Sequence, residues 1–232
     1  MTATLPAEPT PDAEAKYDRQ LIVALLDGRN DAVIVAQAEA LNGKQRTTAL
    51  LSEVVSVRRT AAGGADAQDI EALRAALAGK QRVALPVRAR SRLYLVGEGD
   101  AAQRLLAGWP SSTVAALLAD AGLRDLGLIS IVADGAGRDP DRDDAAQIEP
   151  QSTSFASLLH RALREKHGIA TTVNARVGAV KVVTGPMSPG GVESGRKLTS
   201  PQPGLDADTH HAPRSKLRLR WDGDGQVSEW SY

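Results

Sequence analysis

The chain is 232 residues long, and 42% apolar with 24% charged residues is ordinary for a globular protein with room for one substantial domain. Lysine plus arginine equals aspartate plus glutamate at 28 each, and this formal net charge of zero argues against a surface that coats nucleic acid or membrane throughout. The absence of cysteine excludes disulfides, thiolate metal sites and a cysteine nucleophile, and no apolar run approaches the ~20 residues of a membrane span.

The first half of the chain predicts strands that alternate with helices after a polar leader. Residues 1–15 are rich in proline, alanine, threonine and acids and read as a disordered leader or linker. The predicted elements that follow are a buried strand at 19–26, a helix at 31–43, a strand at 50–59 and an amphipathic helix at 67–78. Asp31 is the expected N-cap of the first helix, and Gly43 is its expected stop.

The second half continues the alternation and ends in strands. The predicted strands lie at 92–97, 128–133, 171–177, 179–184 and 216–221. The predicted helices run from Ser111 or Ser112 to Gly122 and over 153–167. A polar loop at 134–150 and a glycine- and proline-rich stretch at 185–213 separate some of these elements. This order predicts a mainly parallel α/β sheet with an antiparallel extension. The acidic run at 139–144 lacks the glycine and glutamate of a calcium loop, which favours a solvated charge run.

Two short apolar strands each run into a carboxylate. Residues 93–97 end at Glu98, and residues 129–133 end at Asp134. The carboxyl ends of parallel strands are where ligands and catalytic groups collect. The two acids therefore mark one candidate site at one edge of the predicted sheet.

Several stretches carry a resemblance through their shared order and spacing. They are YDRQLIV at 17–23, the segment 31–44 ending in LNGK, LVGEG at 95–99 with LAGW at 106–109, ISIVAD at 129–134, SGRKLT at 194–199 and the closing strand at 215–222. Through them, residues 16–222 resemble the self-cleaving cysteine peptidase domain of large bacterial toxins, of the RTX and clostridial glucosylating types. In this reading residues 223–232 form a C-terminal tail.

That resemblance implies a caspase-like fold, cleavage of the parent toxin after leucine, and activation by inositol hexakisphosphate on a basic surface beside a β-flap. Carried over by position, Asp31 stands where the family has an orienting acid, Glu98 replaces the general-base histidine, and Asp134 replaces the nucleophilic cysteine. The positions that resemble the family's phosphate surface, with the next cation of the closing strand, are Lys44, Arg196, Lys197, Lys216 and Arg218.

A carboxylate pair supplies neither a thiolate nucleophile nor an imidazole base, so cysteine-peptidase activity is expected to be absent. The favoured interpretation is a dead site whose acids face water. The alternatives are a Mg²⁺ or Ca²⁺ site with Asp31 or Asp100 as a further ligand, hydrolysis by carboxylates of which one has a raised pKa, and a misaligned site. His160 and His167 are expected to be partly exposed surface residues rather than replacement bases.

The last predicted strand carries a cation at every second position. Its cations are Arg214, Lys216, Arg218 and Arg220, and they share one face because successive side chains of a strand point to opposite sides. This face is either a solvated surface with acidic neighbours or an anion site for a polyphosphate or an acidic partner. Nucleic acid is disfavoured, because no aromatic stacking platforms lie between the cations.

These observations predict an α/β, caspase-like, mainly parallel sheet flanked by helices, with a C-terminal antiparallel β-flap. The predicted function is that of an inactive peptidase relative, a binding or packaging module, with a toxin or effector segment as the suggested setting. Its predicted partners are a polyanion such as inositol hexakisphosphate, or a protein such as a parent toxin or secretion machinery. The competing prediction is an enzyme with carboxylate-based, metal-dependent hydrolytic chemistry at Glu98 and Asp134. The N-terminus lacks the features of a signal peptide, which leaves bacterial cytoplasm or export by another route.

Overall fold

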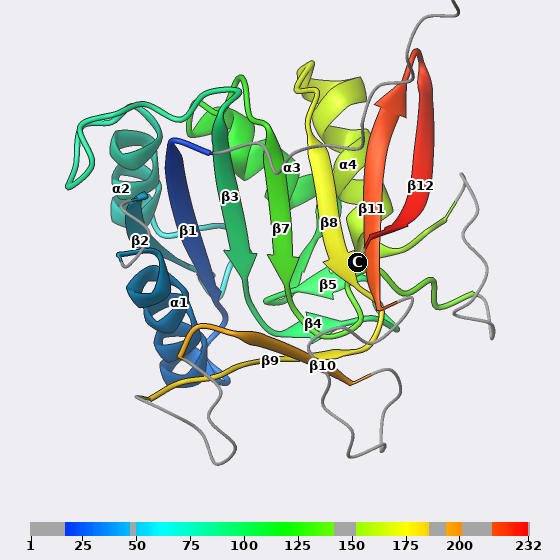
Figure 1. The fold of residues 1–232 in the computed structure, drawn as a ribbon, viewed down its shortest axis with the longest axis horizontal. Helices are drawn as coiled ribbons and strands as arrows, with labels where there is room; N and C mark the ends of the chain where they lie inside the picture. Colours follow the sequence, from blue (N-terminus) through cyan, green and yellow to red (C-terminus); the bar gives the residue numbers. More distant parts are fainter. Residues whose placement is uncertain (1–16, 47–49, 142–151, 186–193, 201–214, 232) are drawn as a thin grey trace, which may run out of the picture.

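The computed structural model describes residues 17–46, 50–141, 152–185, 194–200 and 215–231. Its centre is a seven-stranded sheet in the order β12-β11-β8-β7-β3-β1-β2 (Figure 1). The strands are β1 (Arg19–Leu26), β2 (Leu51–Arg58), β3 (Ser91–Val96), β7 (Leu128–Val132), β8 (Thr172–Arg176), β11 (Lys216–Asp222) and β12 (Gly225–Ser231). Strands β2, β1, β3, β7 and β8 pair in parallel, and β11 and β12 add an antiparallel end. The predicted mainly parallel α/β sheet is confirmed.

Four helices connect the parallel strands. They are α1 (Asp31–Arg46), α2 (Ala67–Leu77), α3 (Ser111–Asp120) and α4 (Phe155–His167). All eight residues of β1 are buried, because helices cover this strand on both sides. Such burial explains why its sequence is a nearly continuous apolar run rather than an alternating one.

The two faces of the sheet are covered unequally. Helices α2, α3 and α4 pack on one face and build the larger core, with Leu73, Leu118 and Leu159 at its centre. On the other face, α1 covers the β1 side through Ile34 and Leu41. We call the remainder of this second face, over β3, β7, β8 and β11, the open face; among the described helices, α1 reaches it at its β3 edge (Figure 1).

The strand register places polar side chains in one row across the open face. Tyr94 of β3 lies beside Ser130 of β7, which lies beside Asn174 of β8, and Asn174 lies beside Arg218 of β11. Side chains at paired positions of neighbouring strands point to the same side of a sheet. An apolar core on one face and a polar row on the other therefore follow from the same strands.

Two small sheets sit at the carboxyl ends of the parallel strands. One consists of β4 (Gly99–Asp100), β5 (Leu105–Leu106) and β6 (Trp109–Pro110). The other, which we call the flap, pairs β9 (Ala179–Val182) antiparallel with β10 (Lys197–Ser200), and it runs below the strand ends in Figure 1. This pair agrees with the predicted antiparallel β-flap.

One glycine fixes where the flap meets α1. Gly195 has φ of +79°, and a Cβ atom there would lie 2.4 Å from the carbonyl oxygen of Ala40. A positive φ and so close a backbone approach both require glycine. Gly195, two residues before β10, is thereby packed directly on α1, beside the Cβ atom of Lys44.

Three predictions about element ends need correction. Helix α1 passes through Gly43 to Arg46, since an interior glycine costs a helix only about 1 kcal/mol and packing across β1 and β2 outweighs it. Helix α3 follows Pro110 without a side-chain cap, although a serine cap was expected. The predicted tail at 223–232 contains β12, which pairs with β11 over its whole length. Within the described residues, no helix combines the length and apolar character that crossing a bilayer requires.

Candidate functional site

The two candidate acids lie at neighbouring strand ends. Val96 of β3 pairs with Val132 of β7, and Glu98 and Asp134 each follow two residues later. The backbones approach closely here, because a Cβ atom on Gly99 would lie 2.2 Å from the carbonyl oxygen of Asp134. The structure therefore brings the two positions together, as the sequence predicted from the parallel sheet.

Glu98 binds the segment that leads into α1. Its Oε2 accepts a hydrogen bond of 2.6 Å from Nδ2 of Asn30, and its Oε1 lies 3.8 Å from Nη1 of Arg29. The same arginine forms a shorter ion pair of 2.6 Å with Asp27. Glu98 thus connects the end of β3 to the start of α1.

Asp134 binds the flap. Its Oδ1 accepts a hydrogen bond of 2.6 Å from the backbone N–H of Val180 in β9. Partial burial of this carboxyl raises its pKa, the hydrogen bond from Val180 opposes that effect, and the nearby charge of Glu98 adds to it. Asp134 thus connects the flap to the end of β7.

The proposed further ligands, Asp31 and Asp100, are engaged within their own turns. Asp31 begins α1, and its Oδ1 accepts a hydrogen bond of 2.9 Å from the backbone N–H of Gly28. Asp31 is not the N-cap, because the N–H groups of the first turn bond to the carbonyl oxygen of Asn30. Asp100 accepts a hydrogen bond from Gln103 N–H. In the part of the chain that the structure describes, no three histidine, aspartate or glutamate residues gather as metal ligands.

The prediction that His160 is a surface residue is wrong. Its side chain is fully buried on α4, where Nδ1 accepts a 2.6 Å hydrogen bond from Nε2 of Gln226 and Nε2 lies 2.9 Å from the carbonyl oxygen of Thr171. Its ring stacks on Trp221 with centroids 4.9 Å apart. Burial lowers its pKa to about 4. The partly exposed position predicted for His167 is confirmed.

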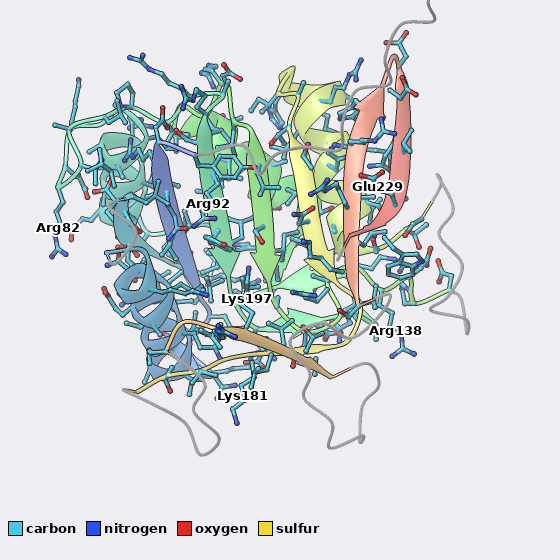
Figure 2. The ribbon with its side chains drawn as sticks, in the orientation of Figure 1. Arg82, Arg92, Arg138, Lys181, Lys197 and Glu229 are labelled. Carbon is cyan, nitrogen blue, oxygen red and sulfur yellow. The ribbon has the colours of Figure 1, made fainter. Side chains whose placement is uncertain are left out.

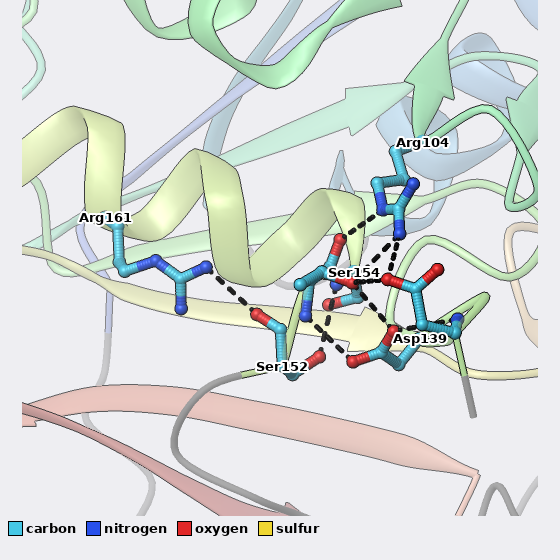
Figure 3. A network of polar contacts seen from close by, with 7 residues as sticks. Arg104, Asp139, Ser152, Ser154 and Arg161 are labelled. Atoms are coloured by element: carbon cyan, nitrogen blue, oxygen red, sulfur yellow. Dashed lines mark hydrogen bonds and ion pairs between the residues drawn. The ribbon is translucent and has the colours of Figure 1, made fainter.

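A polar network holds the described part of the acidic run (Figure 3). The carboxylate of Asp139 accepts hydrogen bonds of 2.8 Å from both the backbone N–H and the hydroxyl of Thr153. Arg104 donates to the carbonyl oxygen of Thr153 and forms an ion pair with Asp141. Residues 142–144 of the run lie outside the described residues. Asp139 and Asp141 thus help to join the loop after β7 to the start of α4.

Cations from five elements gather around one tyrosine on the open face. We call this group the Tyr94 cluster, and it consists of Tyr94 and Arg92 of β3, Lys44 of α1, Arg176 of β8, Lys197 of β10, and Lys216 and Arg218 of β11. Each lysine, Arg92 and Arg176 interacts electrostatically with Tyr94, and Arg218 interacts with Lys216. In Figure 2, Lys197 points from the flap toward the sheet, whereas Lys181 points away from it.

Tyr94 contacts two of these cations directly. Nζ of Lys197 lies 3.4 Å from its hydroxyl and 4.6 Å from its ring centroid, and the guanidinium of Arg92 lies 5.4 Å from the same centroid. Both distances to the ring are in the range of cation–π interactions. Burial would raise the pKa of Tyr94, but the charges of Lys197, Arg92 and Lys44 outweigh it and hold the pKa below its ordinary value.

Lys216 is half-buried and lies among other cations of the cluster. It pairs in register with Arg176, and Arg218 follows two residues later on the same face of β11. Burial, and then the charges of Arg176, Lys197 and Arg218, lower its pKa to about 8. At the outer edge of the sheet, Glu229 of β12 lies 3.7 Å from both Arg218 and Arg220, which supplies the acidic neighbour that the alternative interpretation expected.

Of the predicted anion-binding residues, Lys44, Lys197, Lys216 and Arg218 therefore come together. Arg196 is half-buried just before β10, and Arg214 lies outside the described residues. The sequence prediction missed Tyr94, Arg92 and Arg176. Alternation in β3 and β8 could have placed each on a polar face, but only the strand order brings those faces next to β11.

No protein-family model matches the chain, and no curated protein matches it. Among solved structures, the chain is similar to a secreted C11 cysteine protease from Bacteroides thetaiotaomicron called iotapain, with 12% sequence identity and a TM-score of 0.39. The likeness covers 69% of this chain and 53% of the protease, so the chain spans about half the length of that protein. The relation to the toxin peptidases stays a prediction.

Proposed function

We propose that the chain is a catalytically inactive relative of the toxin self-processing cysteine peptidases, and that it acts as a binding module for a polyanion. The observation that carries this proposal is the Tyr94 cluster, in which cations from α1, β3, β8, β10 and β11 meet on one face of the sheet. Charge-assisted hydrogen bonds from lysine and arginine to phosphate are among the stronger polar contacts that proteins make.

The electrostatics of Lys216 support a polyanion as the ligand. Its lowered pKa means that burial and the neighbouring cations destabilise the ammonium form relative to the neutral amine. A ligand with several phosphates would stabilise the charged forms of all these cations, because each phosphate oxygen can accept hydrogen bonds from more than one of them. Inositol hexakisphosphate is a suitable probe, since its six phosphates are held on a compact ring.

The strand-end acids support inactivity. Glu98 and Asp134 are each bound by a neighbouring element, through Asn30 and Val180. A carboxylate is a poor nucleophile toward an amide, and neither residue replaces the imidazole that would activate one. In this proposal the positions that once carried peptidase chemistry hold α1 and the flap in place.

The same surface fits a protein partner with acidic side chains. A parent toxin, an effector or a secretion component with a run of aspartate and glutamate presents charges at intervals similar to those of a polyphosphate. The module would then package or position that partner rather than cleave it.

Calorimetric titration of inositol hexakisphosphate into the wild-type chain at pH 7 tests the proposal. We expect binding that weakens at higher salt and falls at least tenfold in Lys197→Ala. Lys181→Ala is the matched control, because Lys181 lies on the same flap but points away from the sheet (Figure 2). No heat from a folded protein, or equal loss in both variants, would contradict the proposal.

The raised pKa of Asp134 beside Glu98 favours a second candidate, an enzyme in which this carboxyl donates a proton or the pair binds a divalent cation. A rise in melting temperature with Mg²⁺ or Ca²⁺ that disappears in Asp134→Ala would support it. Cleavage of a peptide by the wild-type chain that either Glu98→Gln or Asp134→Asn abolishes would replace the binding proposal with this one.

A further inference from the structure

Lys216 stands apart from the other described lysines by its surroundings. It is half-buried on the open face, with Arg176 beside it in the register, Arg218 next along its own face and Lys197 reaching from the flap. Tyr94 of β3 acts on Lys216 in the opposite direction, since its charge raises the pKa of the amine. By contrast, Lys80, Lys166 and Lys181 are exposed.

Such surroundings change the chemistry of an amine. Burial and neighbouring cations both favour the neutral form, and a lysine beside another cation is a known arrangement for amines that attack carbonyl carbons. With a pKa of about 8, roughly a tenth of Lys216 carries a free electron pair at pH 7. An ordinary lysine is neutral to an extent on the order of a hundredfold less at that pH.

We propose that Lys216 is a covalent modification site whose Nζ forms an imine with carbonyl compounds that carry a phosphate group. Arg176, Arg218 and Lys197 hold the phosphate and so place the carbonyl carbon beside the amine. The inference rests on the proposed function in one respect, since the cations that bind a polyanion are the ones that hold this phosphate.

The reaction needs no co-reactant. The amine nitrogen of Lys216 forms a bond to the carbonyl carbon, and its proton moves to the carbonyl oxygen to give a carbinolamine. The hydroxyl then leaves with a second proton as water, and the nitrogen–carbon double bond remains. Phosphate binding raises the rate by holding the two groups together rather than by changing the chemistry.

Pyridoxal phosphate is the probe for this experiment. The full chain is treated with it at pH 7, the imine is reduced with borohydride, and peptide mass spectrometry measures the label on each lysine. We expect Lys216 to be labelled at least tenfold faster than Lys80, Lys166 and Lys181. Pyridoxal, which lacks the phosphate, should lose most of this preference, and inositol hexakisphosphate should protect Lys216. In Lys216→Arg the charge is kept and the imine absorbance of the preferred site should disappear.

Equal labelling of Lys216 and the exposed lysines, or preferential labelling of Lys197, would overturn the inference. If inositol hexakisphosphate binds in calorimetry and Lys216 is not preferred, the modification site fails while the proposed function stands. If Lys216 is preferred and the polyanion gives no binding heat, the proposed polyanion function fails while the reactive lysine stands.

Discussion

At the strand ends, Glu98 and Asp134 each accept a hydrogen bond from a neighbouring element, whereas the cations of the Tyr94 cluster gather around one aromatic ring. The first region uses its charges to join parts of the fold. In the second region like charges lie close together, and after burial they contribute to the lowered pKa of Lys216. Both regions carry an electrostatic cost, since the pKa of Asp134 is raised and that of Lys216 is lowered, but the two acids offset theirs with hydrogen bonds that hold the flap and the segment before α1.

The largest effect is expected where the strand ends touch. Gly99→Ala places a Cβ atom 2.2 Å from the carbonyl oxygen of Asp134, and this backbone overlap should lower the free energy of unfolding by about 3 kcal/mol. Urea denaturation measures the loss. Gly64→Ala is the control, since its Cβ would have only a contact of 3.9 Å with Thr60. Equal stability of the two variants would show that the strand ends are not packed in this way.

Acid pH should weaken the fold independently of both regions, through His160. Its pKa is about 4 in the folded chain and about 6.5 when unfolded, so only the unfolded chain takes up the proton between these values. Stability is therefore complete above pH 6.5 and should fall by about 3 kcal/mol as the pH decreases to 4.

Thermal unfolding between pH 7 and 4 checks this loss, and His160→Gln should show a flatter pH dependence over the same range. A wild-type curve as flat as that of the variant would refute the assignment. Ligand binding to either charged region should therefore be measured above pH 6.5, where protonation of His160 does not lower the stability of the fold.

Alkaline pH should act on the Tyr94 cluster in the opposite direction. The pKa of Lys216 is lower in the folded chain than the ordinary value of 10.5, so the folded chain releases its proton first and stability should rise between pH 8 and 10.5. Allowing for partial exposure, we expect a gain of about 2 kcal/mol. Denaturant unfolding at pH 8 and 10 measures it. Lys216→Met should lose most of the gain, the remainder coming from Tyr94, whose pKa is also lowered in the folded chain. A variant with the full gain would show that Lys216 is not its source.

The smallest effect is expected at Asp134. Asp134→Asn keeps an oxygen acceptor for the Val180 N–H and removes the repulsion from Glu98, so its stability should stay within about 0.5 kcal/mol of wild type. Asp134→Ala leaves that N–H without its acceptor and should cost about 1 kcal/mol. Hydrogen exchange of the Val180 amide should speed up only in the alanine variant. Faster exchange in both would mean that the charge, not the acceptor, holds the flap.

Local sequence patterns predicted much of the fold. The apolar run of β1 and the apolar stripe of α4 identify those elements because burial dictates their side chains directly. Alternation in β11 placed Lys216 and Arg218 on one face for the same reason. The carboxyl ends of β3 and β7 placed Glu98 and Asp134 together.

What the sequence could not supply was the pairing of distant segments. Arg92 lies two residues before Tyr94 on β3, whereas Arg176 joins the Tyr94 cluster only because β8 inserts between β7 and β11. His160 is buried because Gln226, 66 residues later, reaches its ring from the hairpin of β12. Its position between Ala156 and Leu163 on the apolar stripe of α4 was the one local sign of burial.

The flap touches both regions with different strands. Its β9 donates the Val180 N–H to Asp134, and its β10 carries Lys197 to Tyr94. Strands β9 and β10 are hydrogen-bonded in register. A ligand that displaces Lys197 is therefore expected to displace Val180 and its hydrogen bond to Asp134 as well. If the proposed ligand binds at the Tyr94 cluster, we therefore expect its binding to alter the position of Asp134 at the end of β7.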